Sequence, residues 1–149
     1  MILNHAWDIV EWNESAISLF KDFITIRKER RNLVIYVFTD EAIQKMYQDW
    51  EANARLLLAQ FRASQALFPN ELRFQQIKNL LLRESEPFSS WWSEHELNSQ
   101  SSGSKVFIHP VVGRLLLSYT AFQSLDHPQL RLVTYMPQDD VSDKRIRYL

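Results

Sequence analysis

Lys105-Val-Phe-Ile-His-Pro-Val-Val-Gly-Arg-Leu-Leu-Leu-Ser-Tyr-Thr120 is the stretch that decides the fold of this chain. Its two apolar runs are typical of β-strands, and His109-Pro110 between them predicts the turn of an antiparallel pair. We therefore expect strands over residues 105–109 and 113–121. Alternate side chains of the second strand would share one face of the sheet, namely Leu115, Leu117 and Tyr119.

The residues after this pair predict a third strand and a short helix. A strand is expected over residues 130–136, and Asp126-His-Pro128 supplies the turn that leads into it. The charged tail, residues 139–149, keeps a thin apolar edge that suits a short docking helix, formed by Val141, Ile146 and Leu149. The chain is thus expected to end in a three-stranded antiparallel meander and a helix.

The residues before the strand pair are mostly helical in pattern. Residues 40–68 form the clearest helix, with a stripe that advances by four and three positions: Trp50, Ala54, Leu57, Phe61, Ser64 and Phe68. Pro69-Asn70 ends it, and Asn70 is suited to cap a following helix. Ser85-Glu86-Pro87 predicts the start of another helix, which would carry Phe88, Trp91, Trp92 and His95. The polar residues 98–104 predict a loop.

The N-terminal part mixes strand and helix signals. Residues 7–12 alternate imperfectly, with Trp at both ends, which predicts a strand. Asn13 is suited to cap a helix that continues to Ile24. Residues 33–38, Leu-Val-Ile-Tyr-Val-Phe, are ambiguous. Their β-branched and aromatic side chains favour a strand, whereas the lack of a preceding Gly or Pro and the Thr39-Asp40 pair that follows favour a helix.

Composition indicates a single folded domain. The 149 residues suffice to bury a sizeable core, and 46% of them are apolar, with five Trp, five Tyr and nine Phe. No apolar run approaches the roughly 20 residues of a membrane span, and the N-terminus lacks the features of a signal peptide. Cysteine is absent, which excludes disulfides and thiolate metal sites. A cytoplasmic location is the expectation.

The charge balance argues against direct binding of nucleic acid. The net charge is −1, whereas a domain that binds phosphates normally carries an excess of Lys and Arg. The one basic cluster, residues 27–31, is interrupted by Glu29 and is typical of a solvated helix end or loop. If the protein acts at DNA, the element that reads DNA lies outside these residues.

Motifs for catalysis, metal binding or phosphate binding are missing. His95-Glu96 does not continue into H-E-x-x-H, because Ser99 stands where the second histidine belongs. Two glycines, Gly103 and Gly113, are too few for a G-x-G-x-x-G turn or a P-loop. No cysteine nucleophile and no G-x-S-x-G occurs. We therefore expect no catalytic residues, no metal and no cofactor.

A series of short motifs precedes the strand pair in a fixed order: Trp12-Asn13, Phe38-Thr-Asp40, Asp49-Trp50, Phe61-Arg62, Ser85-Glu-Pro-Phe88, Trp92 and His95. With the strand pair, this series resembles the ligand-binding domain of the MmyB-like transcription regulators, over about residues 7–136. The resemblance implies one α+β, PAS-like domain over residues 1–149, with a helix at residues 33–38. It also implies an antiparallel sheet with several helices packed on one face, the first strand central beside the last, and a cavity between helices and sheet.

The resemblance further implies a regulatory role. Family members carry an upstream helix-turn-helix of the Xre type, so DNA would be reached only through an element that is not in this chain. The resemblance also implies a fatty-acid-like ligand in the cavity, for which each buried CH₂ contributes about 0.8 kcal/mol. A homodimer without membrane contact is expected. The residues that match the implied cavity are Trp50, Leu57, Phe61, Arg62, Phe88, Trp92, His95 and Tyr119.

Four residues match polar positions of the family pattern and are candidates for the carboxylate end of such a ligand: Arg62, His95, Lys105 and His109. Arg62 and His95 are favoured slightly over the other two. Arg62 has a structural alternative, an ion pair with a nearby glutamate, and Lys105 has a solvated alternative. The aromatic residues are alternatively plain core. Two rival functions stay open, an interaction and dimerisation module without a ligand and an enzyme that acts on a small apolar substrate.

Overall fold

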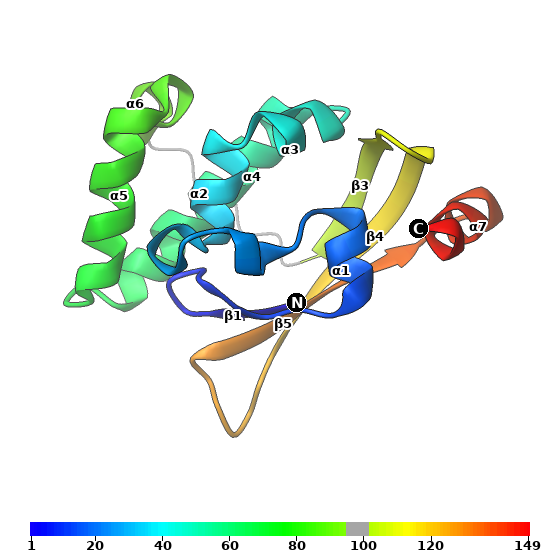
Figure 1. Ribbon diagram of the computed structural model, residues 1–149. Helices are drawn as coiled ribbons and strands as arrows, with labels where there is room; N and C mark the ends of the chain where they lie inside the picture. The colour runs from blue at the N-terminus through cyan, green and yellow to red at the C-terminus, as the bar shows by residue number, and fades with distance from the viewer. Residues whose placement is uncertain (95–101) are drawn as a thin grey trace.

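The computed structural model describes residues 1–94 and 102–149, and within them five strands form one antiparallel sheet (Figure 1). The predicted meander is confirmed as β3 (Ser102–His109), β4 (Gly113–Gln123) and β5 (Leu130–Pro137). Two short strands, β1 (Ile2–Asn4) and β2 (Ile9–Glu11), complete the order β2-β1-β5-β4-β3. The first strand thus lies beside the last at the centre, as expected for a PAS-like α+β fold.

The strand predicted within residues 7–12 is confirmed as β2, but its expected place at the centre of the sheet was wrong. The central strand beside β5 is formed by residues 2–4, whereas residues 9–11 lie at the edge of the sheet. Trp7 explains the difference, because its φ of 69° is left-handed and places it in the turn between the two strands. The turn directs its indole into the interior, where Nε1 donates to Ser64 Oγ at 3.1 Å.

The helix expected from Asn13 to Ile24 is divided. Asn13 does cap α1 (Glu14–Leu19), since its side chain accepts from the Ala16 amide. A 3₁₀ turn, η1 (Phe23–Thr25), then starts separately, because Asp22 accepts from the Ile24 amide and provides a second cap. A second 3₁₀ turn, η2 (Lys28–Arg30), occupies the basic cluster.

The ambiguous residues 33–38 form a helix, α2 (Leu33–Thr39), as the family resemblance implied. Asn32 caps this helix, and its Oδ1 accepts from the amides of Val34 and Ile35 at 2.9 and 3.2 Å. All side chains from Val34 to Phe38 are buried. Burial on every side and a strong cap therefore outweigh the strand propensity of the β-branched residues.

The long helix expected over residues 40–68 is two helices, α3 (Glu41–Met46) and α4 (Trp50–Leu67). Tyr47 leaves the helix to pair with Phe107 of β3, and the Gln48 amide donates to the Val106 carbonyl at 3.0 Å. Asp49 then caps α4 by accepting from the Ala52 amide. The predicted stripe of α4 is buried at Ala54, Leu57, Phe61 and Ser64 but ends with Phe68 exposed.

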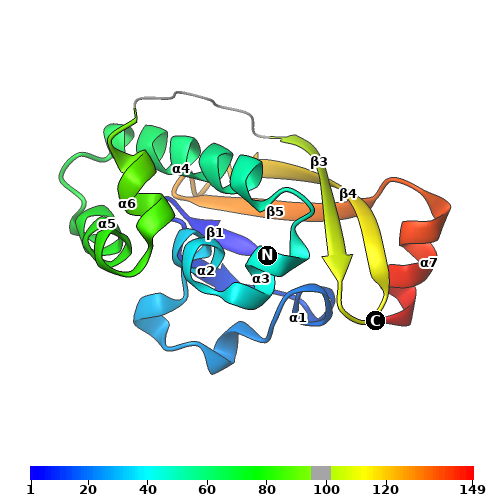
Figure 2. The ribbon, with the colours of Figure 1, turned by 90° about the horizontal axis from the view of Figure 1, so that it is seen from above.

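Two further helices follow, α5 (Leu72–Glu84) and α6 (Glu86–Trp92). Ser85 caps α6 as predicted, since its Oγ accepts from the Phe88 amide. Asn70 does not cap α5, because the N-cap position belongs to Glu71, which makes no side-chain cap bond. Figures 1 and 2 show α1 to α6 on one side of the sheet, with the core between them and the side chains of Phe107, Leu115 and Leu117.

The predicted C-terminal helix is α7 (Asp140–Tyr148), which lies at the end of the sheet away from α5 and α6 (Figure 2). Asp139 caps it by accepting from the Ser142 amide. Ser142 itself is buried, and its Oγ accepts from the Leu116 amide of β4 at 2.8 Å. Val141 is exposed, so the apolar edge predicted for this helix is not continuous. The helix instead docks on the sheet through the buried hydroxyl of Ser142 and the side chain of Ile146.

Replacement of Ser142 by alanine is expected to loosen α7. The Leu116 amide would lose its partner while it stays partly buried, a cost of about 1–3 kcal/mol. Urea unfolding would measure this loss. Ser118→Ala on the same strand removes a hydroxyl that is more accessible and bonded to the Met136 carbonyl, and it serves as the matched control. Equal small losses in both variants would contradict a docking role for Ser142.

Candidate ligand-binding cavity

A cavity of about 200 Å³ lies between the helices and the inner face of the sheet, open to solvent on one side. Its helical wall comes from α2 and α4, and its sheet wall comes from β3, β4 and β5. The residues that line it are Trp7, Leu33, Leu57, Gln60, Ala63, Lys105, Tyr119, Ala121, Arg131, Val133 and Tyr135. Most of these side chains are apolar or aromatic, which is the composition of a small-molecule site.

Lys105 is the most unusual group in this cavity. Its ammonium lies 4.4 Å from the ring centre of Tyr119 and 5.5 Å from that of Tyr47. No carboxylate among the described residues forms an ion pair with it. Burial lowers the pKa of Lys105 to about 8, because the site disfavours the charged form without a counter-ion.

Two further polar groups face the same space. The hydroxyl of Tyr119 is buried and has no hydrogen-bond partner in the described part of the chain, and burial raises its pKa. Gly103 lies opposite Tyr119, and a Cβ there would stand 3.1 Å from the tyrosine ring, so glycine leaves room for that ring. Arg131 stacks over the Trp7 ring at 4.4 Å, and burial lowers its pKa.

The arrangement can hold an anion with an apolar tail. Lys105 and Arg131 supply positive charge, the Tyr119 hydroxyl supplies a donor, and none of the three has a carboxylate partner among the described residues. A buried cation without a partner is costly, and a bound carboxylate would remove that cost. The apolar walls would meanwhile accept methylene groups.

The structure brings only part of the predicted set together. Leu57 and Tyr119 of that set line the cavity, whereas its four other aromatic residues do not: Trp50, Phe61, Phe88 and Trp92. These four belong to clusters where α2, α4, α5 and α6 meet, such as the stacked pair Phe88–Trp92 at 5.2 Å. The structure gives them packing contacts, and their role toward a ligand stays a prediction.

The other polar candidates have different surroundings. Arg62 donates to the carbonyls of Trp91, Trp92 and Glu94, where α6 ends. His109 is buried in the turn between β3 and β4, where its Nδ1 accepts from the Val111 amide at 3.2 Å. His95 lies outside the described residues. Of the three candidates for the carboxylate end that the structure describes, Lys105 is the one that lines the cavity.

Replacement of Arg62 by glutamine is expected to lower the unfolding free energy by about 1–3 kcal/mol, because partly buried carbonyls at the end of α6 lose a charged donor. Ligand affinity would stay the same, since Arg62 does not line the cavity. Arg62→Lys keeps the charge but not the planar fork, so it would recover only part of the stability. A loss of fatty-acid affinity without a loss of stability would instead favour Arg62 as the carboxylate partner.

Sequence reasoning missed several residues of the cavity, among them Trp7, Leu33, Arg131, Val133 and Tyr135. A signal for the last three does exist. They alternate along the predicted third strand, and side chains two apart on a strand share one face. That face is the one shared with Tyr119, because Tyr119 pairs with Tyr135. Nothing local marks Trp7 or Leu33, since long-range packing alone brings them to the cavity.

Comparison with models of known protein families shows which family the chain belongs to. The model of the MmyB-like transcription regulator ligand binding domain matches residues 1–149, the whole chain. The chain belongs to this family. The predicted resemblance, which rested on about residues 7–136, is therefore confirmed and extends over the full length. A comparison with curated proteins finds no match.

As a member of the MmyB-like family, the chain is a regulatory ligand-binding domain of a transcription regulator. Within residues 1–94 and 102–149, no group of three or more His, Asp or Glu side chains is arranged to hold a metal ion. No helix in this described part is both long and apolar enough to cross a membrane.

Proposed function

We propose that this MmyB-like domain senses a fatty-acid-like molecule whose carboxylate lies beside Lys105 and whose chain fills the cavity under α4. The observation that supports the proposal most directly is the buried ammonium of Lys105 without a carboxylate partner in the described residues. The Tyr119 hydroxyl and the Arg131 guanidinium complete a site for an anionic head group. No catalytic step is proposed, and the site would bind its ligand without changing it.

The size of the cavity favours a chain of medium length. About 200 Å³ lies below the roughly 300–1,000 Å³ of pockets that enclose drug-sized ligands. A narrow, flexible chain such as decanoate suits this space better than a fused-ring molecule. Each methylene that leaves water would contribute about 0.8 kcal/mol, and the head group would provide selectivity.

Ligand binding would act on the rest of the regulator through unequal affinity for two states. A ligand shifts an equilibrium only by the difference between its affinities for the two arrangements. The DNA-reading helix-turn-helix that the family resemblance implies would be the element whose arrangement changes. The net charge of −1 agrees with a separate DNA-binding element.

Native mass spectrometry and thermal unfolding test the proposal. The purified chain is expected to bind decanoate, and a concentration one hundred times the Kd would raise Tm by roughly 5–10 °C. Decanol, which has the same chain without the carboxylate, serves as the matched control and should bind more weakly. A chain that shows no mass increment and no thermal shift with decanoate or longer fatty acids would contradict the proposal.

Binding of decanoate is expected to weaken at alkaline pH. Lys105 is mostly protonated below its pKa of about 8 and mostly neutral above it, while the carboxylate stays ionised throughout. A bound carboxylate favours the ammonium form, so affinity is highest below pH 8 and falls as the pH rises above it. Calorimetric titration at pH 7 and pH 9.5 would show that the affinity for decanoate falls about tenfold, whereas the affinity for decanol changes little. The same loss for both ligands would exclude Lys105 as the cause.

A second candidate function, dimerisation without a ligand, is favoured by the outer face of the sheet. Phe122, Leu132 and Met136 are 55%, 44% and 60% exposed there, and Phe122 pairs with Leu132 across two strands. Apolar side chains that gather on one face are typical of an interaction surface. Light scattering tests it. A dimer that Leu132→Lys dissociates, with a Tm indifferent to decanoate, would support this function over ligand sensing.

A further inference from the structure

Lys105 and Arg131 line the same cavity, but the register of the strands separates them along it. Lys105 of β3 pairs with Leu117 of β4. Arg131 of β5 pairs with Gln123, which lies six residues farther along β4 than Leu117. Six residues of strand, at about 3.3 Å each, span about 20 Å. The backbones of the two basic residues therefore lie at opposite ends of the inner face that borders the cavity.

The rings that cover the two cations also belong to different ends of α4. The Lys105 ammonium lies 5.5 Å from the ring centre of Tyr47, which comes just before the first residue of α4. The Arg131 guanidinium lies 4.4 Å from the Trp7 ring, whose Nε1 donates to Ser64 in the last turns of α4. At about 1.5 Å per residue, Ser64 is about 21 Å from the start of that helix. The charged groups themselves are therefore separated, as well as their backbones.

A single carboxylate can contact only one of these two cations. Neither Lys105 nor Arg131 forms an ion pair with any carboxylate of the described chain. A fatty acid whose head group lies beside Lys105 would be attracted by Arg131 from a distance and would leave that guanidinium without a contact partner. A second anionic group at the other end of the ligand would supply the partner.

We propose that the cavity selects α,ω-dicarboxylates of medium length, with one carboxylate beside Lys105 and the other beside Arg131. This inference rests on the proposed function, because it assumes that an apolar chain fills the cavity, and it specifies the class of ligand. The middle of the chain would lie against Ala121 and Val133, which pair with each other between the two basic ends. These two apolar side chains would contact its methylene groups.

The two ends would bind their carboxylates differently. Arg131 has a planar guanidinium that can donate two parallel hydrogen bonds to one carboxylate. Its side chain is less deeply buried than that of Lys105, which two tyrosine rings cover. A carboxylate beside Arg131 would keep part of its water and would lose less on binding than a fully buried one. The carboxylate beside Lys105 would therefore be the deeper of the two.

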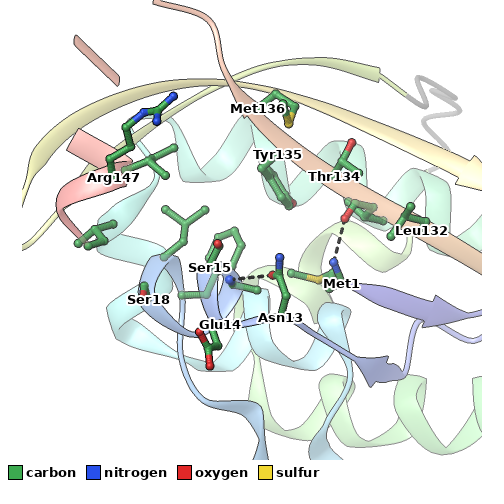
Figure 3. Close-up of a pocket in the computed structure, with 16 residues that line it drawn as sticks. Met1, Asn13, Glu14, Ser15, Ser18, Leu132, Thr134, Tyr135, Met136 and Arg147 are labelled. Carbon is green, nitrogen blue, oxygen red and sulfur yellow. Dashed lines mark hydrogen bonds between the residues drawn. The ribbon is translucent and has the colours of Figure 1, made fainter. Parts of the chain in front are cut away.

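A second hollow, a groove of about 600 Å³ that also borders Tyr135, is a poorer site for such a ligand. Figure 3 shows this groove, with Glu14 on one side, Tyr135 along β5 and Arg147 toward α7. The carboxylate of Glu14 would repel an anion. Arg147 already pairs with Asp143 at 2.8 Å. The charges of the groove thus do not favour a dicarboxylate, whereas those of the cavity do.

Calorimetric titration with decanedioate and decanoate, which have the same number of carbons, tests the inference. At pH 7 both carboxylates of decanedioate are ionised. Decanedioate is expected to bind about five- to tenfold more tightly than decanoate, and about twofold of this reflects its two equivalent ends. Replacement of Arg131 by methionine should reduce the ratio of the two affinities to about two or less. Arg131→Lys keeps a charge without the planar fork and should retain part of the preference.

Arg147→Met is the matched control, because it removes a positive charge from the groove and leaves the cavity intact. It should keep the full preference for decanedioate. A loss of the preference in Arg147→Met would overturn the inference, since the second carboxylate would then lie in the groove. Equal binding of decanedioate and decanoate by the unchanged chain would overturn it as well and leave the proposed function standing. Binding of neither compound would contradict the proposed function itself, so the two failures are distinguishable.

Discussion

Replacement of Lys105 by methionine is expected to weaken decanoate binding by about 10–100-fold. A hydrogen bond between charged groups contributes about 1.5–3 kcal/mol, and methionine keeps the volume of the side chain while it removes the charge. Decanol, which carries no carboxylate, should bind the variant about as well as it binds the original chain. The contrast between the two ligands isolates the charge from the packing of the cavity.

The same replacement is expected to stabilise the empty domain. The folded domain lowers the pKa of Lys105 to about 8 from its usual 10.5, so protonated Lys105 disfavours folding at neutral pH. Between pH 8 and 10.5 the unfolded chain binds more protons, so this residue alone makes stability rise with pH across that window. Lys105→Met should have a higher Tm at pH 7. It should also lack the part of the increase in stability between pH 8 and 10.5 that Lys105 causes.

Thermal unfolding from pH 7 to 10.5 and calorimetric titration would measure both effects. Lys45→Met is the matched control, because Lys45 is exposed and pairs only with Glu41 one helical turn away. Lys105→Arg should keep most of the preference for decanoate over decanol. A Lys105→Met chain with lower stability and unchanged decanoate affinity would show that the ammonium stabilises the fold through the Tyr119 ring rather than serving a ligand.

Replacement of Asn32 by alanine is expected to lower Tm by about 4–16 °C. Asn32 is fully buried, and its Oδ1 caps α2 while its Nδ2 donates to the Ala6 carbonyl at 2.8 Å and to Asp8 Oδ1 at 2.9 Å. Loss of the cap costs about 1 kcal/mol, and the buried groups left without partners add about 1–3 kcal/mol. For a domain of this size, each kcal/mol corresponds to roughly 2–4 °C.

Two variants separate the contributions of Asn32. Asn32→Asp keeps the oxygen that caps α2 but places a carboxylate beside Asp8, so it should be at least as harmful as alanine. Asn13→Ala removes an exposed cap from α1 and should cost only about 1 kcal/mol. Equal losses for Asn32→Ala and Asn13→Ala would mean that the bonds from Asn32 to the β1–β2 turn contribute little.

The strand half of the fold was predictable because its signals are local. Alternation along residues 113–121 and 130–136, with turn residues between them, is set by neighbours in sequence. The break between α3 and α4 was not predictable, because it depends on Tyr47 pairing with Phe107, some 60 residues away. The left-handed turn at Trp7 is also decided by its surroundings, since no glycine marks it.

The candidate site was only partly predictable. Tyr119 and Leu57 could be assigned to the interior from periodicity, and both line the cavity. The charged residues could not, because a sequence does not show which lysine or arginine loses its solvent. The sequence alone would leave the charges of Lys105 in β3 and Arg131 in β5 in solvent, yet the rings of Tyr119 and Trp7 lie over them.

The sequence by itself determined the family, the α+β class and the order of the C-terminal strands, since these follow from motifs and from local alternation. Only the tertiary structure decided which groups meet at the cavity. Burial and strand register are properties of contacts between distant segments: Lys105 has its lowered pKa because the rings of Tyr47 and Tyr119 cover it, and Tyr135 meets Tyr119 because of the register between β4 and β5. The residues next to Lys105 and Tyr135 in the sequence do not determine either of these contacts.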